Sequence, residues 1–286
     1  SAPMIRLDAA TFLLQWAVGG LFFAWVTTRR REVGLGYGWL MRGVFGAMAL
    51  ASVLVAQAIG PVPVRDGAAV GVALAAPAAL VVSVRRKAAG VAGQRETVER
   101  RSARVAAMTG IDRDEQRFDV DAPEFPPALD LVAPAIGLVG LGAAGIDAGS
   151  PAWLSVLRLV VGAAFLGAVT DAMLLGHWYL VQPGLARGPL LELVRWTGWI
   201  WPVHVAVMLI PVGMVSVLNG TIDDDYGGIL GWMWVTCAVT TLGLVVVTRL
   251  ALRERQYSAV MAATGLLYLA ILTAFGQDLV ARAVLA

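Results

Sequence analysis

The feature that most constrains this chain is a series of long apolar runs separated by short polar connections. About 20 apolar residues are needed to cross a hydrocarbon core of roughly 30 Å, and in lipid each segment must satisfy its own backbone polar groups. The sequence therefore predicts an all-α, polytopic integral membrane bundle of about eight transmembrane helices in a single domain. The predicted spans are 9–28, 37–59, 67–84, 131–146, 153–180, 196–218, 229–250 and 257–275.

Composition and missing motifs exclude several classes of protein. The chain is 58% hydrophobic and 15% charged, which leaves no room for a sizeable soluble domain. Cys237 is the single cysteine, so a disulfide, a c-type haem attachment and a cysteine-ligated cluster cannot form within the chain. Hydrolytic, nucleotide-driven and metalloprotease motifs are absent from the sequence. The adjacent carboxylates Asp223, Asp224 and Asp225 could bind a cation, but carboxylates in a Gly-containing turn are usually only solvated.

Basic residues predict the orientation of the bundle. They fall on alternate connections, at 29–31, 85–104, 187–195 and 249–255, and such connections are cytoplasmic in membrane proteins. Both termini are then external. The sequence pI of about 9.0 reflects these arginines and does not indicate nucleic-acid binding. Because Lys87 is the only lysine and Ala, Val, Gly and Leu dominate, we expect a multi-pass protein of a bacterial inner (plasma) membrane.

The connection 85–128 is the long polar segment of the chain, and its charge is divided. Residues 85–104 hold seven basic and two acidic side chains, whereas residues 112–130 hold two basic and seven acidic ones. Residues 96–108 lack Gly and Pro and are predicted to form a short helix. This cytoplasmic loop is a candidate docking surface for a soluble or membrane partner subunit, and the alternative is a solvated loop.

The fifth and sixth runs carry the ionisable side chains that are candidates for chemistry. The short connection 182–195 joins these runs, so we expect antiparallel neighbours. On this topology Asp171 and His204 both lie roughly 12–15 Å from the cytoplasmic side, at 1.5 Å per residue. An ionisable group inside a bilayer is a candidate functional site, and this pair could share a proton. The alternative is a neutral hydrogen bond that only holds two helices together.

His177 and Trp178 lie near the predicted cytoplasmic end of the fifth run, a position that also suits an aromatic belt. His177 and His204 could supply both axial ligands of one b-type haem, although their predicted depths differ by about 6 Å or more. A quinone between helices five and six is the other candidate cofactor. We expect no metal site apart from haem iron.

Further polar groups fall within the runs. Arg158 is predicted near the outer end of the fifth run, where it could reach the headgroups as an anchor; pointing inward, it would offer a charge for an anion or a carbonyl group. Arg42 is predicted as an anchor on the inner side. Four other side chains could line a cavity or join helices by hydrogen bonds, namely Gln15, Gln57, Gln277 and Asp278.

These features favour a membrane subunit of a redox or respiratory-type assembly, which binds a quinone or b-type haem between helices five and six. The polar groups and tryptophans gather near one face, and the runs lack the paired broken segments of many secondary transporters. The alternative is a proton-coupled small-solute transporter or channel that uses Asp171 and His204. A second alternative is a non-catalytic membrane scaffold or assembly subunit.

Overall fold

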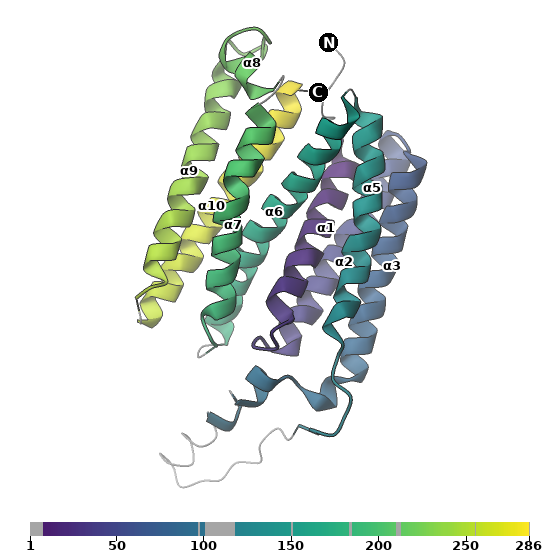
Figure 1. Ribbon diagram of the computed structural model, residues 1–286, viewed down its shortest axis with the longest axis vertical. Helices are drawn as coiled ribbons and strands as arrows, with labels where there is room; N and C mark the ends of the chain where they lie inside the picture. The colour runs from purple at the N-terminus through teal and green to yellow at the C-terminus, as the bar shows by residue number, and fades with distance from the viewer. Residues whose placement is uncertain are drawn as a thin grey trace.

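A computed structural model of the chain describes residues 8–96, 98–100, 118–149, 151–182, 185–209, 213–254 and 256–285. Every regular element in these residues is a helix (Figure 1). The helices are α1 (Ala9–Thr28), α2 (Leu35–Ile59), α3 (Pro63–Arg85), α5 (Val132–Ala148), α6 (Ala152–Val181), α7 (Gly188–Leu209), α8 (Met214–Leu218), α9 (Ile229–Ala251) and α10 (Tyr257–Leu285), with short 3₁₀ helices η1 (Lys87–Ala89) and η2 (Pro127–Leu131).

The predicted fold class is confirmed. Seven of the described helices are long and apolar enough to cross a membrane: α1, α2, α3, η2 with α5, α6, α9 and α10. The remaining predicted crossing corresponds to α7, which is 22 residues long and runs alongside α6. It is not among these seven, and it carries Glu192, Arg195 and His204 within its length.

The long helices stand side by side, and α6 joins two groups of them (Figure 1). On one side α6 packs on α1 and α5, which contact α2 and α3; on the other it packs on α7 and α10, which contact α9. We call the end where α1 begins and α10 ends the termini end. The opposite end, below which the described residues between α3 and η2 lie, is the loop end (Figure 1).

Close contact between α1 and α6 holds the centre of the bundle. A Cβ atom added at Gly19 would lie 1.8 Å from the carbonyl oxygen of Ala163, and one added at Gly167 would lie 2.2 Å from the carbonyl carbon of Gly19. Small residues at such a crossing allow the two backbones to touch, and packing of this kind drives helix association in lipid.

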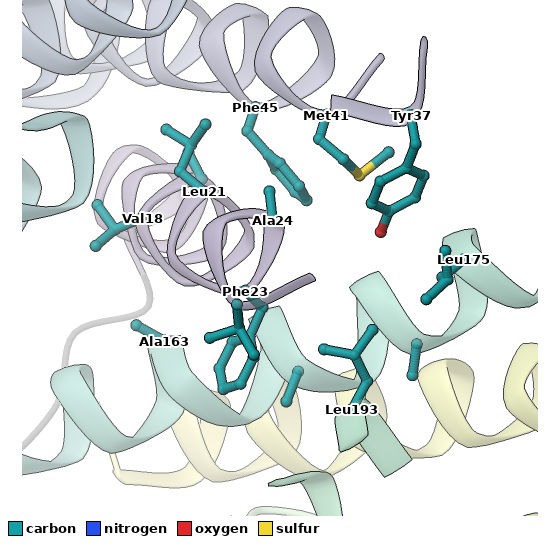
Figure 2. Close-up of a cluster of buried hydrophobic side chains, with 14 of the residues drawn as sticks. Val18, Leu21, Phe23, Ala24, Tyr37, Met41, Phe45, Ala163, Leu175 and Leu193 are labelled. Carbon is teal, nitrogen blue, oxygen red and sulfur yellow. The ribbon is translucent and has the colours of Figure 1, made fainter. Parts of the chain in front are cut away.

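An apolar core lies between α1, α2 and α6 towards the loop end. Figure 2 shows Ala24 of α1 facing Phe45 and Met41 of α2, Phe23 on the opposite side of α1 towards Leu193 of α7, and Leu175 of α6 to the right. These side chains are at most 5% exposed, so this region is closely packed. It separates the polar groups described below from the loop end.

Two helices differ from their predicted bounds. α7 begins at Gly188 and ends at Leu209, whereas a continuous span over 196–218 was predicted. Its start includes Pro189, which suits the first turn of a helix, and Pro211 follows its end, where proline disfavours continuation. α10 continues to Leu285, ten residues beyond the predicted end, so the expected tail is part of the helix.

Arg42 is not the membrane anchor that its position suggested. Its guanidinium group donates two hydrogen bonds of 2.7 Å to Asp130, and it lies 4.4 Å from the centre of the Phe125 ring. The neighbouring Glu124 pairs with Arg31 and with Arg95. Two described acidic residues of the segment 112–130, Glu124 and Asp130, are therefore bound at the loop end of the bundle. Most of the helix predicted at 96–108 lies outside the described residues.

Candidate functional site

Five polar side chains from three helices meet inside the bundle near the termini end. We call this set the polar cluster: Gln15 of α1, His204 of α7, and Gln277, Asp278 and Arg282 of α10. None of the five residues is more than 1% exposed. Asp278 lies seven residues before the end of α10, which is about 10 Å of helix. The cluster thus lies inside the bundle, about two helical turns from the end of α10.

The imidazole of His204 lies at the centre of the polar cluster. Its Nδ1 atom is 2.9 Å from Gln277 Nε2, and its Nε2 atom is 3.6 Å from Asp278 Oδ1. The ring of Phe165 stacks on it with centroids 4.5 Å apart. With the Gln277 amide donating to Nδ1, the neutral ring carries its proton on Nε2, facing the carboxylate of Asp278.

Asp278 is ion-paired as well as close to His204. Arg282 lies one helical turn further along α10 and donates a 2.7 Å hydrogen bond from Nε to Asp278 Oδ2. The same guanidinium group donates to Gln15 Oε1 and lies 5.4 Å from the centre of the Phe12 ring. This network links α10 to α1 and holds the carboxylate of Asp278 in place.

Gly162 makes room for the network on α6. A Cβ atom at this position would lie 2.4 Å from Gln15 Nε2 and 3.3 Å from Asp278 Oδ1. Since side chains essentially never approach to 2.4 Å, the polar groups of α1 and α10 meet here only because α6 carries a glycine.

Arg158 points into the bundle, which is the second of the two positions predicted for it, and it does not reach the headgroups as an anchor. Its side chain is fully buried, and its Nε atom donates a 2.8 Å hydrogen bond to the carbonyl oxygen of Val207. That carbonyl belongs to the last turn of α7, where intrahelical partners are lacking and the helix dipole is negative. Arg158 thus binds the end of α7 from inside the bundle.

Four buried polar atoms of the cluster have no hydrogen-bond partner: Gln15 Nε2, His204 Nε2, Gln277 Oε1 and Asp278 Oδ1. Buried polar atoms are rarely left this way in proteins. A proton added to His204 would sit on Nδ1 and engage one of them: if the Gln277 amide turned over, Oε1 would accept from Nδ1–H. The Nε2–H group, which the neutral ring already carries, would be drawn more strongly to Asp278 Oδ1 by the positive charge. The arrangement can therefore accommodate either a neutral or a charged imidazole.

The predicted pair of Asp171 and His204 is not formed. The groups against His204 are Phe165, Gln277 and Asp278, whereas neither carboxylate oxygen of Asp171 has a hydrogen-bond partner. The cause is the start of α7: His204 lies sixteen residues after Gly188, roughly 24 Å from the loop end at 1.5 Å per residue. Asp171, ten residues before Val181, is roughly 15 Å from that end.

The two histidines are too far apart to bind one haem. His177 is exposed, and its Nδ1 atom lies 3.2 Å from the hydroxyl group of Tyr268. Its partner Tyr268 and the partner of His204, Gln277, are nine residues apart on α10, which is about 14 Å of helix. The residues thus do not fit the bis-histidine haem that the sequence suggested.

Trp178 also lies away from His204. Its ring centre is 6.1 Å from that of Tyr37, at the loop end of the bundle. Among the predicted site residues, Arg158 binds the carbonyl group of Val207, three residues after His204 on α7. Trp178 and Asp171 each approach Tyr37, whereas His177 is exposed beside Tyr268.

Asp224 of the predicted acidic triplet has a structural contact. Its carboxylate accepts hydrogen bonds from the backbone N–H groups of Tyr226, Gly228, Leu230 and Gly231, at the start of α9. These bonds, that from Gly228 foremost, lower the pKa of Asp224. Within the described ranges no three His, Cys, Asp or Glu side chains form a group that could hold a metal ion.

The sequence interpretation missed Arg282, although Gln15, Gln277 and Asp278 were recognised as polar groups inside spans. The indication was present, because Asp278 and Arg282 have the i,i+4 spacing of a helical ion pair. It was overlooked because the last helix was expected to end at residue 275. No known protein-family model, curated protein or solved structure matches the chain.

Proposed function

We propose that this chain is a proton-coupled membrane transporter of small solutes, in which His204 binds the coupling proton. In the sequence analysis the transporter was the alternative, and the redox subunit was favoured; we now favour the transporter. Asp278 and Arg282 form the fixed ion pair beside the imidazole, and Gln277 orients it. Asp171 is not part of this group.

The observation that carries the proposal is the set of unpaired atoms around His204. Imidazole gains and loses a proton near physiological pH. Ionisable groups inside a membrane cost free energy, and where they occur they usually mark a functional site. Here the neutral ring leaves Gln277 Oε1 without a donor, while its Nε2–H faces Asp278 Oδ1 across 3.6 Å. A charged ring would add an Nδ1–H group that can donate to Gln277 Oε1 once the amide turns over, and it would place a positive charge beside the Asp278 carboxylate.

The interruption after α7 supports the same function. Discontinuous helices whose ends meet buried polar groups are frequent in secondary transporters. α7 ends at Leu209 and α8 begins at Met214, and Arg158 binds a carbonyl oxygen of the last turn of α7. His204, five residues before Leu209, is thus near a point where the chain leaves the helix.

Transport can be tested in vesicles of synthetic phospholipid that contain no quinone and enclose a pH-sensitive dye. Under an imposed pH gradient, amino acids, sugars, carboxylic acids and organic cations are added in turn. We expect at least one of these solutes to change the internal pH in vesicles with the wild-type protein. The response should be abolished in His204→Gln, which removes the titratable ring.

His177→Gln is the matched control, because it removes the other histidine of the chain from an exposed position. It should transport as the wild type does. A response that survives in His204→Gln would contradict the proposed role of His204, and wild-type vesicles that respond to none of these solutes would contradict the transporter.

A second candidate is the redox subunit that binds a quinone. The observation that favours it is the hydrogen-bonding pair of His177 and Tyr268, which is exposed on the lipid-facing surface of α6 and α10. Such a pair could bind the carbonyl group of a quinone that diffuses in the bilayer. Vesicles without quinone separate the candidates, because quinone chemistry cannot operate there.

We further propose that the loop end is cytoplasmic in a bacterial plasma membrane. The basic residues Arg30, Arg86, Arg187 and Arg253 all lie at connections of this end, as the rule for cytoplasmic loops requires. Residues 85–128 would then be presented to a cytoplasmic partner.

A further inference from the structure

Asp171 is a fully buried carboxyl group that the polar cluster does not use. It lies on α6 within the apolar core shared by α1, α2 and α6, where Ala168, Ala172 and Leu175 of the neighbouring turns are also buried. Tyr37 of α2 approaches it, and the tyrosine hydroxyl donates to the backbone carbonyl of Asp171 at 3.3 Å. Figure 2 shows this hydroxyl pointing towards α6.

The other buried acidic side chains in the described residues each have an arginine partner or backbone donors. Asp130 pairs with Arg42, Asp66 with Arg65, Asp278 with Arg282, and Glu192 with Arg29 and Arg30, while Asp224 accepts backbone N–H groups. Both oxygens of Asp171, in contrast, have no hydrogen-bond partner at all. Among the buried acids of the described residues, Asp171 is thus the one whose carboxyl group has neither an arginine partner nor a backbone donor.

The groups that face Asp171 do not stabilise a negative charge. Tyr37 directs its hydroxyl to the backbone of Asp171 and also interacts with the side chain of Thr27 of α1. The next titratable group on this side is the hydroxyl of Tyr179, which is neutral and donates to the carbonyl of Ala186. No described arginine or histidine is paired with Asp171. An ionised carboxylate in such surroundings is strongly disfavoured, whereas a neutral carboxylic acid is tolerated.

We infer that Asp171 is a second proton-binding site, which holds its proton in the state described here. The carboxyl group is roughly 15 Å from the loop end, on the opposite side of the central contact from the polar cluster. Water that reached it through an opening between α1, α2 and α6 would allow it to release that proton. The inference does not depend on the role of His204, because it rests on different residues.

Infrared spectroscopy of the full chain in lipid vesicles tests this directly. Protein labelled with carbon-13 in the aspartate carboxyl group should show, at neutral pH, an isotope-shifted carbonyl band of a protonated carboxylic acid. The band should disappear in Asp171→Asn and persist in Asp130→Asn, where an ion-paired carboxylate is removed instead. Asp171→Glu, which keeps an acid but removes the labelled residue, should also lose the band and covers the case in which the asparagine variant does not fold.

Two results would overturn the inference. The first is a labelled wild-type protein with no band from a protonated aspartate. The second is a band that remains in both Asp171 variants and therefore comes from another aspartate. Neither result tests the proposed proton coupling through His204, because that proposal is tested by the change of internal pH in vesicles.

Discussion

At the scale of single residues, the polar cluster depends on Gly162, which has no side chain. Gly162 lets Gln15 and Asp278 approach each other across α6. The Arg282 guanidinium group, which binds both of these side chains, is held by that approach. A methyl group at this position would displace Gln15 and Asp278, and it would therefore disturb the ion pair between Asp278 and Arg282.

We predict that Gly162→Ala lowers the free energy of unfolding by about 1–3 kcal/mol, the usual range for overpacking a closely packed interior. It should also impair transport, because the displaced Gln15 no longer binds Arg282. The measurement is thermal unfolding in detergent. Gly243→Ala is the control, since a Cβ atom there meets nothing within 4 Å. Equal stability of the two variants would show that the close approach is not required.

The residues of the site were largely predictable, and their partners were not. His204, Asp171 and Asp278 stand out because ionisable side chains are rare in apolar runs. Pairing, however, depends on depth, and an error of eight residues at the start of α7 shifts His204 by about 12 Å. Only the structure gives the partners of each group.

At the scale of helices, the start of α9 illustrates how a polar turn is joined to an apolar span. Asp224 accepts four backbone N–H groups there, and two of them, from Leu230 and Gly231, belong to the first turn of α9, where intrahelical partners are lacking. The carboxylate also suits the positive end of the helix dipole. The folded state therefore favours the ionised form, which is why the pKa of Asp224 is lowered.

This lowered pKa gives a pH-dependent prediction. A group whose pKa is depressed by folding stabilises the folded state above its unfolded pKa, and this contribution is lost as the pH falls through the folded pKa. Asp224→Ala should therefore lower the Tm at neutral pH, and the difference from the wild type should shrink below about pH 4, the ordinary range for aspartate. The check is thermal unfolding across pH, with Asp223→Ala as control because that side chain accepts only from Asp225 N–H. A Tm difference that is constant with pH would contradict the account.

At the scale of the whole molecule, the sequence was sufficient to predict an all-α membrane bundle. Lipid imposes span length and internal hydrogen bonding on every segment, so apolar runs translate directly into helices. How these helices pack against one another could not be predicted from the sequence. The contact of Gly19 with α6 and the polar contacts that join α1, α7 and α10 around His204 depend on how the side chains pack.

The central claim is that His204 takes up a proton inside the bundle and shares it with Asp278. Nuclear magnetic resonance of protein labelled with nitrogen-15 in histidine tests it, since the chain has only two histidines and His177→Gln leaves the signals of His204 alone. We predict that both ring nitrogens change from the neutral to the charged pattern as the pH is lowered. The charged fraction at a given pH should fall in Asp278→Asn, because the carboxylate that stabilises the imidazolium is gone. A ring that stays neutral at every pH at which the protein remains folded would contradict the claim.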